Sequence, residues 1–513
     1  MRAIITVGLL LLIATAFPIQ NGDLYIYDNY RNTSHQLKQR EFHQGQETVY
    51  SIVIHENSDF RTYYGFPGNG TADNPYMIEN LNITGAHFTW ISISNTDAHF
   101  VIRNCTLEGE GVRWTGHGIT IDLWPATSYG IFFSNVTNGK IQDCNISSIS
   151  RGIGIEDSND CVLENTDILD TGYAIGFLKS NSCIVTDNNI NSSKIGMQFI
   201  RSFENLIENN HVTNTRGVTI EDSGENKFFE NSISQGFSFS FDEGYLHNNI
   251  SDNMLDGREI LYLYSQQDST FDCDNYGQVI LAECNNLYVT NGQITEVRYA
   301  VILLHSSNCS VSGFQVEDSY TGVRIQDSDN VKVENCTIHS SSKGVYVSNS
   351  DGIIVRDCNI ITSGWLADGI FVYISAGVTI TSCSVIQENS LLLSMSLQNT
   401  KHYIISEIDG GYSESFKPKW SPVPDYNAGI RLYHVDEFLI AENVISHYRV
   451  GINISNSSNG IISLNTINNA GYAIYHIEDN SHGVLVIDII QIGILGSITT
   501  LVILLIIWIR KRR

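Results

Sequence analysis

The sequence predicts an all-β fold, a single-stranded parallel β-helix, because one unit of about 22 residues recurs along most of the chain. The unit is clearest in GIGIEDSNDCVLEN from Gly152 and in TGVRIQDSDNVKVENC from Thr321. Its first β-branched position recurs in steps of 22 residues within three groups: Ile131, Ile153, Ile175 and Met197; Val301, Val323 and Val345; Ile430, Ile452 and Ile474. A fixed period of this size is typical of a solenoid.

The elements within each unit are predicted to be short strands. Apolar residues alternate with a period of two, as at Val323 and Ile325, and Asn, Ser, Asp and Gly separate the strands. A leucine-rich repeat would need a fixed Leu-x-x-Leu-x-Leu frame, which the chain does not show. The recurring β-branched positions, called the repeat anchors below, predict about 17 coils. Stacking at roughly 4.8 Å per coil then gives a rod on the order of 80 Å long.

Composition limits the classes of partner. The chain has 513 residues, 42% of them hydrophobic, which is enough for one long continuous core. Its net charge is −26 and its pI is about 4.8. Nucleic-acid binding requires clustered Lys and Arg, so we expect no nucleic-acid partner.

The two ends of the chain differ from the repeats. Residues 1–16 read as a secretory signal peptide, residues 17–75 as an N-terminal cap and residues 76–483 as the β-helix domain. A transmembrane helix is expected over 484–509, with a charge-free stretch from Ile489 to Ile509, followed by a basic cytoplasmic tail at 510–513. The predicted topology is one pass, with the solenoid on the extracellular side of the cell membrane.

Asn-x-Ser/Thr triplets support an exported surface. The candidate glycosylation sites are Asn32, Asn69, Asn82, Asn135, Asn145, Asn191, Asn249, Asn308, Asn453 and Asn456. Asn104 and Asn335 belong to the same triplet type, but they are expected in an inward row where a glycan would not fit.

The ten cysteines recur at fixed positions of the repeat. Side chains at one repeat position stack on neighbouring coils, so buried thiol ladders are favoured. A Cys161–Cys183 or Cys336–Cys358 disulfide is the alternative, since Cα atoms about 4.8 Å apart lie within disulfide range. No Cys-x-x-Cys or His-x3-His spacing exists, and we predict no metal site and no cofactor.

Two segments carry a resemblance to a known group. SDFRTYYGFPGNGTADNPYMIENLNIT from Ser58 resembles the entry segment of many secreted β-helices, and the long coil from Asp256 is similar to one in NosD-like proteins. The chain thus resembles the right-handed parallel β-helix proteins of the pectate-lyase-like superfamily, in particular the NosD-like and carbohydrate-binding and sugar-hydrolase types. This implies handling of a polymer or of a partner protein. The family name also suggests copper, but the five Met and irregularly spaced His do not favour it.

Three insertions break the 22-residue period: Gly109–Tyr129, Gly364–Asp368 and Gly410–Asn427. All three fall at the same point of the coil, so they should share one edge of the rod. They supply the candidate substrate-binding residues Trp114, His117, Asp122, Trp124, Trp365, Asp368, Trp420, Asp425 and Tyr426. Aromatic rings beside carboxylates suit sugar binding; alternatively, each Trp folds back to anchor its own loop.

Binding is favoured over catalysis. The sequence predicts a membrane-anchored surface protein that binds polysaccharide or partner proteins. The alternative is a membrane-tethered polysaccharide lyase or glycoside hydrolase, and a NosD-like copper-related maturation factor is the weaker alternative. No catalytic residue is assigned, because the acidic residues Asp157, Asp160, Asp327 and Asp329 lie in turn sequences and are expected to form polar corners.

Overall fold

The computed structural model describes residues 51–85, 89–109, 128–240, 246–388, 427–477, 484–487 and 490–492. These residues form a parallel β-solenoid of about 15 turns, against about 17 expected. Helix is confined, in the part of the chain that the structure describes, to the four residues of α3 (Asp59–Thr62). The strands and their parallel register confirm the predicted fold class.

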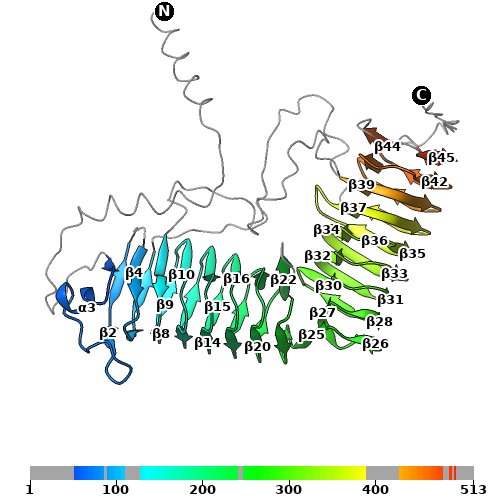
Figure 1. Cartoon of the computed structure of the whole chain (residues 1–513). Coiled ribbons are helices and arrows are strands. Elements are labelled where there is room, and N and C mark those ends of the chain that lie inside the picture. Colours follow the sequence, from blue (N-terminus) through cyan, green and yellow to red (C-terminus); the bar gives the residue numbers. More distant parts are fainter. Residues whose placement is uncertain are drawn as a thin grey trace, which may run out of the picture.

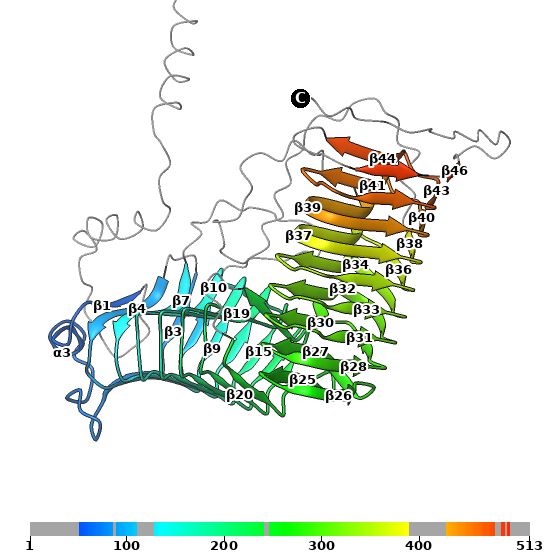
Figure 2. The same cartoon turned by 45° about the vertical axis from the view of Figure 1, so that its right-hand side comes forward.

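The solenoid has two arms that meet at an angle (Figures 1 and 2). In the first arm the sheet that carries the repeat anchors, here called the anchor sheet, contains β1 (Ile52–Ile54), β4 (Thr89–Thr96), β7 (Tyr129–Val136), β10 (Arg151–Glu156), β13 (Tyr173–Leu178), β16 (Ile195–Ile200), β19 (Val218–Glu221) and β22 (Phe237–Ser240). The second sheet contains β2 (Tyr76–Glu79), β5 (Phe100–Arg103), β8 (Gly139–Gln142), β11 (Val162–Glu164), β14 (Ile184–Thr186), β17 (Leu206–Glu208), β20 (Lys227–Phe229) and β23 (Asn249–Ser251). The third sheet contains β3 (Asn82–Thr84), β6 (Thr106–Glu108), β9 (Asn145–Ser147), β12 (Asp167–Leu169), β15 (Asn189–Asn191), β18 (His211–Thr213), β21 (Ser232–Ile233) and β24 (Met254–Leu255).

The second arm has three corresponding sheets, with several longer strands. Its anchor sheet runs through β25 (Arg258–Tyr264), β27 (Tyr276–Ala282), β30 (Tyr299–Leu304), β32 (Gln315–Gln326), β34 (Thr337–Ser348), β37 (Asp368–Thr381), β39 (Ala428–Ala441), β41 (Val450–Ser455) and β44 (Tyr472–Ile477). The second sheet holds β26 (Gln267–Asp272), β28 (Asn285–Thr290), β31 (Ser310–Ser312), β33 (Lys332–Glu334), β35 (Ile354–Arg356), β42 (Ile461–Ser463) and β45 (Leu485–Ile487). The third sheet holds β29 (Gln293–Thr295), β36 (Asn359–Thr362), β38 (Ser384–Gln387), β40 (Val444–Ser446), β43 (Thr466–Asn468) and β46 (Ile490–Ile492). β32 and β34 begin in the third sheet, whereas β37 and β39 extend into the second.

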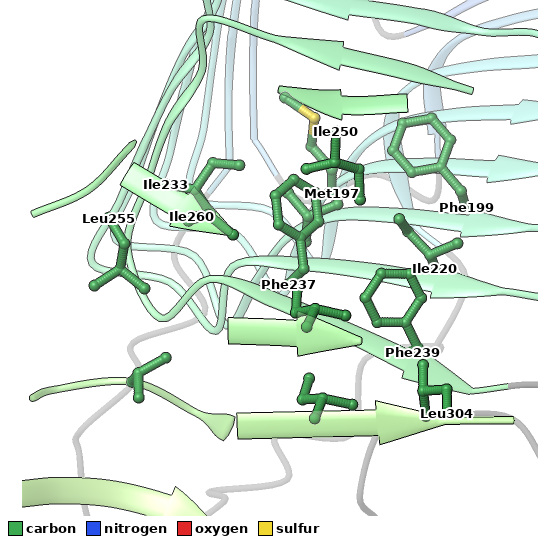
Figure 3. Close-up of a cluster of buried hydrophobic side chains, with 14 of the residues drawn as sticks. Met197, Phe199, Ile220, Ile233, Phe237, Phe239, Ile250, Leu255, Ile260 and Leu304 are labelled. Atoms are coloured by element: carbon green, nitrogen blue, oxygen red, sulfur yellow. The ribbon is translucent and has the colours of Figure 1, made fainter. Parts of the chain in front are cut away.

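The 22-residue period is the register of the anchor sheet. Ile153 pairs with Ile131 on one side and with Ile175 on the other. These side chains point inward and are at most 1% exposed, and the described inward residues form one hydrophobic cluster that runs through both arms. The core also continues through the bend: Phe237 and Phe239 of the first arm and Leu304 of the second belong to the same cluster, and Figure 3 shows Phe239 beside Leu304.

Part of the predicted cap belongs to the solenoid. β1 pairs with β4, so the first coil begins before residue 76. Helix α3 places Phe60 against the core, where its ring stacks on Tyr76 at a centroid distance of 4.7 Å and contacts Phe100 at 5.3 Å. Phe60 is fully buried and covers the end of the first coil. Residues 17–50 lie outside the described part of the chain.

Rows of buried Asn side chains run along the inside of the coil corners. Asn188, Asn210, Asn231 and Asn253 are at most 2% exposed and stand on successive coils. The Oδ1 atoms of Asn210, Asn231 and Asn253 each accept from the backbone N–H of the preceding Asn in the row, at 2.9–3.1 Å. Each row therefore pairs backbone groups that a tight corner would otherwise leave without a hydrogen bond.

The exposed Asn of each corner forms a separate, outer row. Asn104 and Asn335 are exposed, so the prediction that they point inward is wrong. Asn104 has a φ of 52°, which Asn tolerates better than most residues, and its Nδ2 donates to Asn80 at 2.7 Å. Conversely, the candidate glycosylation site Asn453 is 1% exposed, which leaves no space for a glycan in the folded chain.

The predicted thiol ladders are confirmed. All ten cysteines are buried and free. Cys161 lies one coil below Cys183, and Cys336, Cys358 and Cys383 form a column of three. Each of these three thiols donates to the carbonyl two residues earlier at 3.2–3.3 Å. Hydrogen bonds from the neighbouring thiols of Cys336 and Cys383 lower the pKa of the Cys358 thiol.

The structure describes only part of the predicted transmembrane segment, residues 484–509. Among the described residues, no helix is long and apolar enough to cross a membrane. Leu485–Ile487 and Ile490–Ile492, which lie within the predicted transmembrane segment, are strands that pair with β42 and β43. The solenoid thus extends beyond residue 483, and residues 493–513 are outside the described part.

Candidate functional site

The three insertions leave the solenoid at the same point of the coil. They connect β6 to β7, β36 to β37 and β38 to β39, always from the third sheet to the anchor sheet. The last insertion is longer than predicted, because β37 pairs directly with β39 and the whole of 388–427 lies between coils. Seven candidate residues lie outside the described residues: Trp114, His117, Asp122, Trp124, Trp420, Asp425 and Tyr426.

Trp365 and Asp368, the two described candidates, have different environments. Trp365 is 67% exposed and its neighbour Leu366 is 50% exposed, so this Trp does not fold back onto the core. Asp368 is 6% exposed. Its carboxylate accepts from Nε and Nη2 of Arg431, each at 3.0 Å, and from the backbone N–H of Ala428 at 2.9 Å. Asp368 therefore stabilises the solenoid, and it is not available to a sugar hydroxyl as predicted.

An aromatic surface lies next to this ion pair on the outer face of the anchor sheet. The inward residues of β34 and β37 are apolar, and the alternating outward ones are Tyr346, Phe371 and Tyr373. Tyr346 pairs with Phe371 across the sheet, and Tyr373 pairs with Tyr433 of β39. The stacked rings have centroid distances of 5.6 Å for Tyr346–Phe371 and 5.6 Å for Tyr373–Tyr433.

Lys343 completes this surface. Its Nζ lies 5.9 Å from the ring centroid of Tyr346 and 5.6 Å from that of Phe371, within cation–π range. Trp365 belongs to the loop that leads to Asp368, whose backbone pairs with that of Lys343. We refer to Lys343, Tyr346, Phe371, Tyr373 and Tyr433, together with Trp365 at their edge, as the aromatic patch.

Tyr373 of the aromatic patch keeps its hydroxyl proton at neutral pH. Partial burial, together with the neighbouring Tyr433 and Tyr346, raises the pKa of Tyr373 above its usual value. At neutral pH its hydroxyl is therefore both a hydrogen-bond donor and an acceptor. The patch offers ring faces, hydroxyl groups and one ammonium group on rigid strands.

A smaller cluster of the same kind lies on the first arm. The Arg151 guanidinium lies 5.3 Å from the ring centroids of both Tyr129 and Tyr173, which flank it on adjacent coils. Its Nη1 donates to the Tyr129 hydroxyl at 2.6 Å, and Tyr129 packs on Phe132 at 4.7 Å. We refer to Tyr129, Phe132, Arg151 and Tyr173 as the first-arm cluster.

Among the residues that the structure describes, acidic side chains form no comparable cluster. Asp157 and Asp160 are exposed, and both have φ near 50°, so these polar corners are as predicted. Burial is the main cause that raises the pKa of Glu156 at the end of β10, with a contribution from Asp157. A polar cleft of about 330 Å³ lies between the second and third sheets of the second arm, lined by Asp272, Asp274, Asn291, Gln293, Gly313 and Gln315.

Family comparisons agree with this architecture. Residues 80–281 match the model described as periplasmic copper-binding protein (NosD), and residues 247–400 and 299–475 match that of the right-handed β-helix region. The chain is a right-handed parallel β-helix repeat protein. Within that class, residues 80–281 are similar to the NosD-like proteins. No curated protein matches the chain.

Solved structures resemble the chain only at low similarity. The A-module of mannuronan C-5 epimerase AlgE6 from Azotobacter vinelandii is 10% identical over 78% of this chain and 90% of its own, with a TM-score of 0.29. The surface adhesin PfbA of Streptococcus pneumoniae is 13% identical over 68% and 85%, with a TM-score of 0.25. The periplasmic alginate epimerase AlgG is 11% identical over 77% and 85%, with a TM-score of 0.27. Resemblance at this level assigns no activity to the chain.

Copper, which the family description names, does not fit the donors in the described ranges. Nowhere in those ranges do three His, Cys, Asp or Glu side chains come together as metal ligands. The thiols, the softest donors, are buried in the core and donate to backbone carbonyls, as Cys358 does to Arg356. They are arranged as packing groups and not as a ligand set.

Proposed function

We propose that the chain is a glycan-binding scaffold and that the aromatic patch is its binding surface. The observation that carries this proposal is the alignment of Tyr346, Phe371, Tyr373 and Tyr433 on neighbouring strands, outward and half-buried. Aromatic faces cover the C–H faces of sugars, and the hydroxyls and Lys343 donate hydrogen bonds to sugar oxygens. Strands hold these groups in place before the ligand arrives, which lowers the entropic cost of binding.

The fold supports an elongated ligand. Successive coils repeat the same outward positions about every 4.8 Å, so the patch extends along the axis of the solenoid. A polysaccharide is a repeating chain, and its successive units can use equivalent positions on successive coils. The extended polymer is therefore a better match than a compact small molecule, which would need a concave pocket.

The test is retention on an array of polysaccharides, with the full-length chain in detergent micelles. We expect retention of at least one polysaccharide and no new reducing ends or unsaturated sugars in the eluate. New reducing ends would favour the alternative, a lyase or glycoside hydrolase. Absence of retention on every polysaccharide would contradict glycan binding.

The location of the protein is also part of the proposal. A secretory-signal pattern over residues 1–16 and a stop-transfer pattern around Arg510–Arg513 favour a solenoid outside the cell and the basic run on the cytoplasmic side. Because β46 ends at Ile492, the proposed membrane anchor is the apolar stretch from 493 to 509. The length of this stretch is near the lower limit for a helix that spans a bilayer.

Protease treatment of intact cells checks this topology. We expect external protease to remove the solenoid while a tag placed after Arg513 stays with the membrane fraction. Cells opened with detergent before treatment are the control, in which the tag is also degraded. A solenoid that survives in intact cells but not in opened cells would contradict the proposed location.

A further inference from the structure

The bend joins two stretches of anchor sheet that both lie on the inner side of the angle (Figures 1 and 2). The first arm carries the first-arm cluster on this sheet, and the second arm carries the aromatic patch. We propose that both arms bind one polysaccharide chain together and that the junction residues hold them at a fixed angle for this purpose. This inference rests on the proposed function and adds a second contact region and a required ligand length.

The junction is closed by one side chain that takes the place of a strand. The anchor sheet of the first arm ends at β22, which leaves backbone groups of that strand without a further strand. Gln278 of β27 fills this position: its Oε1 accepts from the N–H of Phe237 at 2.8 Å, and its Nε2 donates to the Phe237 carbonyl at 2.8 Å. The same Nε2 donates to the carbonyl of Tyr299 at 2.9 Å. Gln278 is fully buried, so the two arms share one amide group.

The backbone at this contact admits only glycine. Gly236 has a φ of 69°, and a Cβ at this position would lie 2.4 Å from Oε1 of Gln278. Any larger residue would displace the amide from the edge of β22. The contact between the arms is thus built from both sides, by a glycine on one arm and a buried amide on the other.

Two more side chains fix the angle. Nη1 of Arg324 donates to the carbonyl of Phe239 at 2.8 Å, while its guanidinium lies 5.2 Å from the ring centroid of Tyr299. Nε2 of Gln235 donates to the carbonyl of Glu296 at 3.0 Å. Together with the continuous core in Figure 3, these bonds make the junction a rigid corner and not a flexible linker.

The fixed corner sets the size of the ligand. Between the junction and each cluster lie three or four coils of the anchor sheet, roughly 15–20 Å on each side. A disaccharide is too short to touch both clusters, whereas one polysaccharide chain that crosses the angle reaches both. Two linked contacts on a rigid support increase affinity through effective concentration without any new interaction.

The experiment compares two surface variants of the full-length chain in detergent micelles. The probe is whichever of polygalacturonate, xylan and soluble chitin is retained most strongly, together with its dimer. Arg151→Ala/Tyr173→Ala changes the first-arm cluster, and Tyr373→Ala/Tyr433→Ala changes the aromatic patch. We expect each double variant to raise the Kd for the polymer about tenfold or more. We also expect wild type to bind the polymer at least tenfold more tightly than the dimer.

The outcomes separate this inference from the proposed function. If the first-arm variant binds the polymer as wild type does, the shared surface is refuted while glycan binding at the aromatic patch stands. If neither variant changes binding, both proposals fail. Gln278→Leu adds a measurement without ligand: its far-UV circular dichroism checks folding, and small-angle X-ray scattering should show a wider spread of interatomic distances than in wild type. An unchanged scattering curve would overturn the role of Gln278 in fixing the angle.

Discussion

Replacing Asn210 with Ala is expected to lower the free energy of unfolding of the solenoid by about 3 kcal/mol or more. The Asn210 side chain is 2% exposed, and its Oδ1 accepts from both N and Nδ2 of Asn188, at 3.0 and 2.9 Å. Its Nδ2 donates to the carbonyls of Val185 and Glu208 at 2.9 Å each. Alanine removes these bonds and leaves several buried groups without partners, each costing about 1–3 kcal/mol.

The adjacent Asn209 provides the matched control. It is exposed, and its Nδ2 donates to Oδ1 of Asp187 in the outer row. Because Asn209 has a φ of 55°, the control is Asn209→Gly, which keeps this backbone conformation without strain. Guanidinium-induced unfolding followed by circular dichroism should show a large fall in the midpoint for Asn210→Ala and a small one for Asn209→Gly. Equal midpoints would mean that the buried rows do not hold the coils together.

The second large effect is expected for Asp368→Ala, at about 3 kcal/mol. The side chains of Asp368 and Arg431 are 8% and 15% exposed, so removal of the carboxylate takes a counter-charge and two hydrogen bonds away from a mostly buried guanidinium. The backbone N–H of Ala428 also loses its acceptor, at the point where the chain re-enters the solenoid after the long insertion. Both losses act on the same coil.

Restoring the balance of charge should recover part of this stability. In the Asp368→Ala/Arg431→Met variant no buried charge is left unpaired, so its unfolding midpoint should lie above that of Asp368→Ala. Glu79→Gln removes one partner of the exposed Arg103–Glu79 pair and should change the stability by less than about 1 kcal/mol. If Asp368→Ala were as stable as wild type, the carboxylate would have another role than the structural one described.

The fold was predictable because its signals are local. Inward Ile and Val alternate with polar residues, corners carry Asn and Asp, and the period of 22 is the register between coils. The thiol ladders follow from the same period. The bend was not predictable, since it depends on Gln278 bonding Phe237, a residue 41 positions earlier. A single Gln in a strand carries no sequence signal for that contact.

The candidate site was predictable only at its edge. Trp365 was found because it lies where the period breaks, whereas the aromatic patch was missed because its residues occupy regular strands. Tyr346, Phe371 and Arg431 stand at one position on successive coils, but insertions separate them by unequal numbers of residues. Only the structure aligns them. Asn453 shows the opposite error, since the triplet Asn-Ile-Ser is a valid acceptor in sequence but its Asn is buried.

The most direct measurement is the retention of Tyr373→Ala/Tyr433→Ala on the polysaccharide that holds the wild-type chain. The matched control is Tyr288→Ala, a tyrosine of the second sheet that is 47% exposed and lies outside the aromatic patch. At about 1 kcal/mol for each lost ring contact, the double variant should bind at least tenfold more weakly, while Tyr288→Ala should bind as wild type does. Equal retention of the double variant and wild type, with both folded, would contradict glycan binding at the aromatic patch.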